Sequence, residues 1–515
     1  MKKLIGTLNE RFVLILTLLL IFSSRIITFF TPILNIDESD FAVQTAVWLN
    51  KGIPYIDFVE KKPILIHMAY AIPFHIFGVW NMTAVHIFFA LIVMTTGLII
   101  YATVSKISGK QVGIIAILIF AVYQAGYDTN DFLAANTETL MNFFSGCTVF
   151  FLVLDLCEDK NKFYLLLSGV FLGLAILSKQ VAIALLPPMI ISLIVKEIKT
   201  GKIRAILTKS LLLSLGLLIP FLVLFAYLYY QGALGWFYRW VWVENIKYAS
   251  NAVPFLVVLM HGINGINRIG VFMLAFIPLW ILTIIYAIRI IRNRDLSAIN
   301  IFLFSWLIFC FPAVSLGGRF FPHYFLQFLL PLTIISALAW HKIITPISER
   351  SKLIDFASLA IVIIIPYLIF FALHFYEIQN KFKFVTEKLV GKTIASLAAP
   401  SDRIFVWGHS SDIYYYSKRL PSSRFIYCSY LTGANEGFEN IKVSPTKNIN
   451  KEAWKLLMED LANKKPKWVV DMSGTKKRGY NKFPISSYSE LDNLIKNNYS
   501  LALNIKGSHI FSLNK

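Results

Sequence analysis

The sequence is poor in charged residues and in cysteine. Charged residues make up 15% of the 515 residues, against about 25% in an average soluble domain. Hydrophobic residues make up 57%, which excludes a disordered chain and an ordinary soluble enzyme. The four cysteines show neither the density of a disulfide scaffold nor the spacing of a zinc site. The composition therefore predicts a polytopic α-helical membrane protein.

The net charge of +20 is spread over segments between apolar stretches. A nucleic-acid-binding protein gathers its basic residues in one patch on a soluble surface. Here the distribution favours the headgroups of a bilayer as the partner of the basic residues. We therefore expect contact with membrane lipid and no nucleic acid.

Long apolar stretches recur along the chain. A bilayer core takes about 20 residues per helix. Windows of that kind predict eleven spans, at roughly 12–31, 81–104, 111–127, 138–156, 163–178, 181–195, 207–230, 270–290, 298–316, 323–340 and 354–375. Ile64–Val79 is either a further span or a re-entrant helix, so we expect about 11 to 13 spans. The first run lacks a cleavage site and is interpreted as a retained span.

The basic residues between the spans are unevenly divided. With the N-terminus in the cytoplasm, 18 lysines and arginines of the membrane portion fall on the cytoplasmic side and 8 on the opposite side, the tail not counted. This bias favours that orientation. It places three segments outside: the long loop 32–80, the loop Gln231–Ile269, and the tail.

Two domains follow from this map. Residues 1–375 are expected to form the transmembrane module. Residues 376–515 are expected to form a periplasmic α/β domain, because apolar runs at 403–407 and 467–471 alternate with polar helical stretches.

Charged residues mark both ends of the first outer loop. Asp37 and Glu38 follow the first span; they are either solvated helix-capping residues or hold a general base at the mouth of a cavity, with Asp37 the candidate. Lys62 precedes an apolar run and either snorkels or binds a lipid phosphate. An aspartate and a lysine at opposite ends of one loop can face each other across a pocket.

Further candidates lie at the outer ends of later spans. Glu138 begins an apolar run, where a carboxylate either complements a helix dipole or is functional, and Asp131 lies close before it. Lys179 is a turn residue or a second phosphate contact. Arg319 suits phosphate, and His323 and Tyr324 add donors, although aromatic residues at this depth also form ordinary belts. Together these groups fit transfer from a lipid phosphate.

The order of several motifs resembles a known family. The motifs are Asp37-Glu38, Gly52–Asp57, Lys61–Pro63, Asn136–Glu138, Gly173–Gln180, Gly318–Phe325, Asp402–Gly408 and Ile413–Ser417. In this order they resemble bacterial lipid-linked-sugar glycosyltransferases of the GT-C superfamily, related to protein O-mannosyltransferases and lipid A aminoarabinose transferases. The chain has Lys62-Pro63-Ile64 where many relatives have two prolines.

The resemblance implies a GT-C fold in a bacterial inner membrane and an inverting hexosyl- or pentosyltransferase. Its donor would be a polyprenyl-phosphate sugar, with undecaprenyl phosphate as carrier, and its acceptor a periplasmic glycolipid, lipopolysaccharide or protein. It implies that Asp37 is the base on the acceptor, that Lys62 contacts the donor phosphate, and that Glu138, or else Asp131, contributes a carboxylate.

No cofactor or metal site is expected, although carboxylate clusters can also bind a divalent cation. The main rival function is a flippase or transporter of a lipid-linked sugar. The long first loop, the large tail and the lack of repeat symmetry count against it. An O-antigen ligase or polymerase is a second rival, which typically carries its large loop late among the spans.

Overall fold

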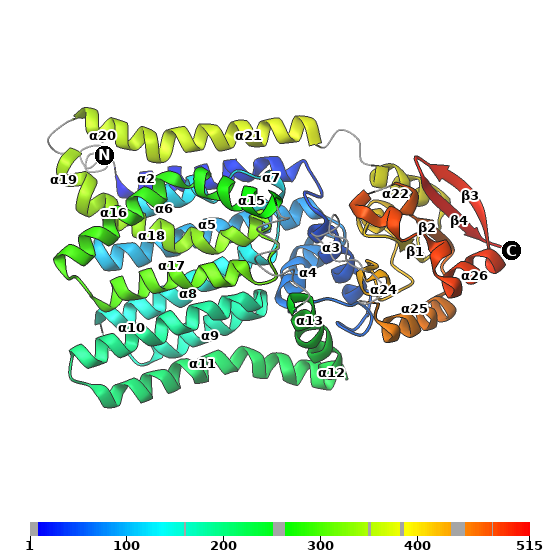
Figure 1. Ribbon diagram of the computed structural model, residues 1–515, viewed down its shortest axis with the longest axis horizontal. Coiled ribbons are helices and arrows are strands. Elements are labelled where there is room, and N and C mark those ends of the chain that lie inside the picture. Colours follow the sequence, from blue (N-terminus) through cyan, green and yellow to red (C-terminus); the bar gives the residue numbers. More distant parts are fainter. Residues whose placement is uncertain are drawn as a thin grey trace.

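A computed structural model of the chain describes residues 9–158, 161–250, 263–348, 352–381, 386–433, 449–475 and 477–514. Figure 1 shows three regions along its longest axis. Long helices lie side by side in a bundle. The helices α3 (Ile36–Leu49) and α4 (Leu65–Phe77) lie at one end of it, and a mixed helical and β-sheet region follows beyond them. Part of the second outer loop lies outside the described residues.

Eight helical segments in the described part of the chain are long and apolar enough to cross a membrane. They are Glu10–Phe29 (α2 and η1), α5 (Met82–Ser108), α8 (Thr137–Glu158), Gln180–Lys199 (η2 and α10), α11 (Ile203–Tyr230), α17 (Ala298–Ser315), Pro322–Ile347 (η4, α18, η5 and part of α19) and Phe356–Gln379 (parts of α20 and α21, with η6). A ninth span forms if α15 (Ile263–Ala275) and α16 (Ile277–Asn293), bent by 74°, cross together.

Each of the eleven predicted spans coincides with helical structure, and the polytopic helical fold is confirmed. By length and composition, eight or nine segments of the described residues qualify as spans, against the 11 to 13 predicted. The helices α6 (Lys110–Tyr123) and α9 (Phe163–Ser178) have 14 and 16 residues, and α4 has 13. At 1.5 Å per residue they fall short of a bilayer core of about 30 Å. The stretch Ile64–Val79 therefore forms a short helix at the end of the bundle.

Glycines bring α9 and α11 into backbone contact. A Cβ at Gly169 would lie 2.1 Å from the carbonyl oxygen of Leu213, and one at Gly216 would lie 2.1 Å from that of Leu166. Gly169 and Gly173 form a small-xxx-small pair. In a membrane no hydrophobic effect drives helices together, and such pairs let them associate through close packing. This contact places the end of α9, and Lys179 after it, against the outer region.

We predict that Gly169→Ala and Gly216→Ala each destabilise the fold by about 1–3 kcal/mol, because a backbone carbonyl cannot move aside as a side chain can. Thermal unfolding in detergent, followed by tryptophan fluorescence, should show a lower Tm. Gly235→Ala in α12 (Leu234–Phe237) is the matched control, since a Cβ there meets no atom within 4 Å. An unchanged Tm in Gly169→Ala would contradict the close packing.

The region after the bundle contains a four-stranded sheet in the order β1-β2-β4-β3. The strand β1 (Ile404–Trp407) pairs in parallel with β2 (Trp468–Asp471), and β4 (Ser508–Leu513) pairs antiparallel with β2 and with β3 (Tyr499–Ile505). The two predicted apolar runs are β1 and β2. The same region contains five helices: α22 (Thr386–Leu397), α23 (Asp412–Ser417), α24 (Ser429–Thr432), α25 (Lys451–Lys464) and α26 (Ser489–Asn498).

The sheet region and the first outer loop share one hydrophobic core. Val43, Tyr55 and Phe58 of the loop belong to the same buried cluster as Phe405 and Val470 of the sheet. Residues of the second outer loop join it through α12 and η3 (Tyr238–Val243), which α13 (Glu244–Ser250) follows, and Trp240 is fully buried. Because apolar burial is the main stabilising force, the loop is held firmly between the bundle and the sheet.

Candidate functional site

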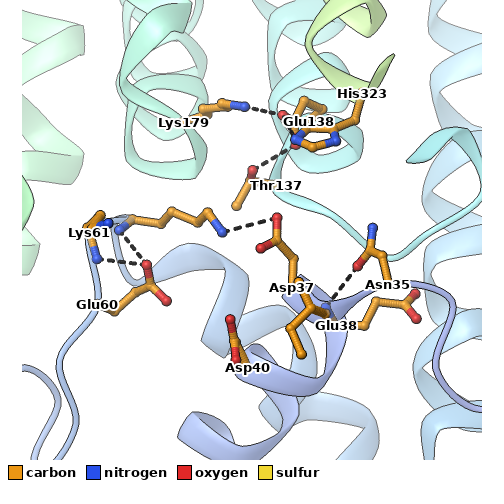
Figure 2. Close-up of polar contacts among 12 residues, drawn as sticks. Asn35, Asp37, Glu38, Asp40, Glu60, Lys61, Thr137, Glu138, Lys179 and His323 are labelled. Carbon is orange, nitrogen blue, oxygen red and sulfur yellow. Dashed lines mark hydrogen bonds and ion pairs between the residues drawn. The ribbon is translucent and has the colours of Figure 1, made fainter. Parts of the chain in front are cut away.

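The helix α3 begins at the cap Asn35, whose side chain accepts a hydrogen bond of 3.1 Å from the backbone of Glu38. The cap is therefore neither Asp37 nor a serine. Asp37 lies in the first turn, where the positive end of the helix dipole favours a carboxylate. Its carboxylate is left to face the site, as Figure 2 shows.

Asp37 and Lys62 meet although 25 residues separate them. The Nζ atom of Lys62 lies 3.3 Å from Oδ2 of Asp37. The side chain of Lys62 is 25% exposed and that of Asp37 is 28% exposed. The ammonium also lies 4.4 Å from the ring centre of Phe41. The structure thus brings the two ends of the first outer loop together in a pair that small molecules can still reach.

The two pKa values reflect this pairing. Burial would raise the pKa of Asp37, but the ammonium of Lys62, followed by the charge of His323, lowers it to about 2. Burial would lower the pKa of Lys62, but Asp37 and then Glu60 raise it above its ordinary value. In the free protein both groups are therefore charged at neutral pH.

Glu60 holds the Lys62 end of the loop and was not among the sequence candidates. Its Oε1 accepts hydrogen bonds from the backbone N–H groups of Lys61 and Lys62, at 2.7 and 3.0 Å. Its side chain is buried, and this burial raises its pKa. The signal in the sequence is an acidic residue two positions before the candidate lysine.

A second cluster lies at the start of α8. Glu138 is 1% exposed, forms an ion pair with Lys179, and lies 3.6 Å from Nε2 of His323. The other ring nitrogen of His323 lies 2.9 Å from Oδ1 of Asp131. Four candidates that are distant in sequence therefore form one network, and Lys179 is more than a turn residue.

Tyr324 and Arg319 border this network. The ring of Tyr324 lies 4.2 Å from Nζ of Lys179, a cation–π contact. Arg319 is buried, and Nη1 donates to the carbonyl of Gly317 at 3.2 Å. It lies three residues before η4 (Pro322–Phe328), which carries His323 and Tyr324 of the site.

Glu38 lies apart from the other candidates. It is fully buried and accepts hydrogen bonds from the backbone of Leu34 and Ala135, both at 2.7 Å, and is 2.9 Å from Nε2 of His86. Figure 2 shows its side chain turned away from Asp37. These contacts hold α3 against α5 and the segment before α8.

The two clusters belong to one site. Glu138 contributes to the raised pKa of Lys62, and His323 to the lowered pKa of Asp37. A cavity lies farther along the same face of α8, lined in part by Asn142, Ser145 and Gln327. Asp37, Lys62 and the Glu138 network therefore surround a polar end of an otherwise apolar bundle.

Metal binding finds no support in the described ranges. No group of three or more histidine, cysteine, aspartate or glutamate side chains in them could hold a metal ion. The candidate carboxylates are paired with cations and backbone donors instead.

The chain is a multi-pass membrane protein with the fold of GT-C glycosyltransferases, and the comparisons confirm the resemblance stated above. Residues 61–230 match the family described as dolichyl-phosphate-mannose-protein mannosyltransferase. This domain covers Lys62, Glu138 and Lys179. No curated protein matches the chain in sequence.

Two solved glycosyltransferases share the fold. ArnT from Cupriavidus metallidurans, bound to undecaprenyl phosphate, is 14% identical with a TM-score of 0.56, over 96% of this chain and 97% of ArnT. The oligosaccharyltransferase of Archaeoglobus fulgidus, solved with zinc and sulfate, is 13% identical with a TM-score of 0.55, over 97% of this chain and 73% of its own. Identities this low show a shared fold, and the family match to residues 61–230 points to lipid-linked sugar transfer as the class of activity.

We predict that Glu138 and Lys179 stabilise the fold only as a pair. Glu138→Gln or Lys179→Met alone should destabilise it by on the order of 3 kcal/mol, because each leaves a charge without its partner in a buried place. The double variant should be more stable than the sum of the two changes predicts. Thermal unfolding of the four proteins measures this coupling.

Lys496→Met is the control for the pair. Its partner Asp492 lies one turn away on α26, and the lysine side chain is 68% exposed. A surface pair of this kind contributes about 0–1 kcal/mol. Additive effects of Glu138→Gln and Lys179→Met would show that the buried pair does not couple.

Proposed function

We propose that the protein is an inverting glycosyltransferase that moves a hexosyl or pentosyl group from a polyprenyl-phosphate donor to an acceptor outside the membrane. The observation that carries this proposal is the Asp37–Lys62 pair of 3.3 Å at the outer end of an apolar bundle. The pair offers a cation for a phosphate and a carboxylate beside it for a proton.

Donor binding would exchange one anion for another at Lys62. A donor phosphate that approaches the ammonium competes with Asp37 for it, and the partial exposure of both side chains leaves room for this approach. Without the ammonium, the burial that raises the pKa of Asp37 is less opposed. The carboxylate thus becomes a better base when the donor is in place.

The proposed transfer forms one bond to the anomeric carbon and breaks another. Asp37 takes the proton of an acceptor hydroxyl or amine, and the acceptor oxygen or nitrogen forms a bond to the anomeric carbon from the face opposite the phosphate. The bond between that carbon and the phosphate oxygen breaks, and the polyprenyl phosphate leaves with its charge compensated by Lys62. Attack from the opposite face inverts the configuration.

The Glu138 network is the second part of the proposed site. Lys179, held by Glu138 and Tyr324, and Arg319 beside them would supply further positive charge to the donor. His323, between Asp131 and Glu138, offers a proton donor to a sugar hydroxyl. Glu138 and Asp131 would act by orienting these cations, since both carboxylates are paired in the described structure.

The proposed arrangement has residues 1–375 as the membrane module and 376–515 as a periplasmic domain in the inner membrane of a bacterium. The basic bias of the predicted cytoplasmic loops supports this orientation. Undecaprenyl phosphate is the proposed carrier because the ArnT structure contains it. A periplasmic glycolipid, lipopolysaccharide or protein is the proposed acceptor.

We predict that Asp37→Asn abolishes transfer while donor binding persists, and that Lys62→Met weakens donor binding. The first change removes the base; the second removes the charge that holds the phosphate. Label transfer from a panel of undecaprenyl-phosphate sugars to a membrane extract, with purified protein in nanodiscs, measures the activity. Competition by undecaprenyl phosphate measures binding.

Asp57→Asn and Lys247→Met are the matched controls. Asp57 lies in the same loop and accepts from the backbone of Ile53 at 2.8 Å, a bond that asparagine retains. Lys247 is an exposed lysine of α13. Transfer by Asp37→Asn at the rate of the wild type would contradict the mechanism. A flippase would instead move the lipid without any transfer, with or without Asp37.

The anion exchange also predicts a pH dependence. The profile of kcat/KM reports the free enzyme, where the pKa of Asp37 is about 2. The profile of kcat reports the donor complex, where Lys62 has moved to the phosphate and the pKa of Asp37 is higher. Activity falls as Asp37 is protonated, so the acid limb of kcat should lie at higher pH than that of kcat/KM. In Lys62→Met the acid limbs of the two profiles should lie at the same pH. Acid limbs at the same pH in the wild type would exclude the exchange of Asp37 for the donor phosphate at Lys62.

A further inference from the structure

The sheet region contacts α3 within one turn of Asp37. Nε2 of His409 lies 3.2 Å from Oδ2 of Asp40, and the hydroxyl oxygens of Ser39 and Ser411 lie 2.7 Å apart. His409 follows β1 after Gly408, and Ser411 precedes α23. These contacts join residues about 370 positions apart in the sequence.

Asp40 is a buried carboxylate with little compensation. Its side chain is 5% exposed, and that of His409 is 10% exposed. The second oxygen, Oδ1, has no hydrogen-bond partner among the residues that the structure describes. Because a buried anion is costly unless it is paired, the position of Asp40 depends strongly on His409.

The geometry couples this pair to Asp37. Asp37 and Asp40 are three residues apart on one helix, so their side chains lie on the same side of it. When protonated, His409 lowers the pKa of Asp37, and the carboxylate of Asp40 raises that of Lys62. A displacement of Asp40 would therefore rotate the turn that carries Asp37 and change the field at the ion pair.

His409 is itself held within the sheet region. Its carbonyl accepts a hydrogen bond from Arg478, and its ring lies 5.1 Å from that of Tyr427. The ring of Tyr427 in turn lies 5.9 Å from Nζ of Lys61, the neighbour of Lys62. The imidazole thus transmits the position of the sheet region to α3.

We propose that His409 is a positioning residue which, through Asp40, sets the first turn of α3 so that Asp37 can reach the acceptor. The inference deepens the proposed transfer and rests on it. The C-terminal region then completes the active site by holding the helix of the base. Donor binding depends mainly on Lys62, which lies on another segment, so loss of His409 should change it far less than it changes kcat.

The kinetic test compares His409→Ala with His409→Gln. His409→Ala should lower kcat by about 10- to 100-fold, the effect of a base that is misplaced by about 1 Å, with the KM for donor within about threefold of wild type. His409→Gln restores an N–H donor toward Asp40 and should recover most of kcat. Because the two residues act as a pair, Asp40→Ala combined with His409→Ala should be no worse than either alone.

Lys464→Met is the control, since it removes a contact of 3.7 Å with Asp57 that joins the same two regions farther from Asp37. Its kcat should equal that of the wild type. An unchanged kcat in His409→Ala would overturn the proposal. An equal loss in His409→Gln would also overturn it, because it would show that the imidazole acts on substrate rather than through Asp40.

Hydrogen–deuterium exchange over residues 36–49 tests the positioning without any donor. Exchange should be faster in His409→Ala than in the wild type, Lys464→Met and His409→Gln. If the wild type transfers no sugar, the proposed function fails, but this measurement still decides whether His409 holds α3. Identical exchange in all four proteins would overturn the positioning role.

Discussion

The ion pair between Asp37 and Lys62 is the interaction on which the arrangement of the outer region depends. It closes a long loop at its two ends, where the chain leaves one membrane helix and approaches the next helical layer. Loop closure is entropically unfavourable, and the hydrophobic core shared with the C-terminal sheet offsets it. The pair therefore sits on a rigid base although its own side chains stay partly exposed.

The partial exposure of the pair distinguishes it from the other charges of the site. Glu38 and Glu138 are almost fully buried and engage fixed partners. Such groups are expensive to disturb, because a broken pair leaves a charge without compensation. Glu38 and Glu138 therefore suit a structural role, holding their partners in place. Asp37 and Lys62 can separate at lower cost because water reaches both, so a phosphate can take the place of a carboxylate there.

Much of the architecture follows from local patterns. Apolar windows located the helices of the bundle, and two short runs located β1 and β2, because burial in lipid or in a sheet demands continuous apolar sequence. The helices α6 and α9 coincide with predicted apolar windows but, with 14 and 16 residues, are shorter than a usual span. The close approach of α9 and α11 depends on Gly169 and Gly216, and their partnership is visible only when both helices are placed.

The site was predictable where one loop carries both partners. Asp37 and Lys62 could be paired from the sequence because the ends of a loop return to the same face of a membrane. The pairing of Lys179 with Glu138, and of His323 with Asp131, joins different spans, and no local pattern specifies which spans are neighbours. Asp40 with His409 is the extreme case, since one partner follows a strand of the C-terminal sheet.

This distribution suggests a division of labour within the outer region. Contacts that act on the donor come from the ends of membrane helices, at the depth where a lipid phosphate lies. Contacts that hold the proposed base come from the sheet, through Asp40 and His409. In the proposed orientation, an acceptor that approaches from outside meets the sheet region before it meets Asp37. A base whose helix is held from that side is therefore more sensitive to what the sheet region binds than is the proposed contact of Lys62 with the lipid phosphate.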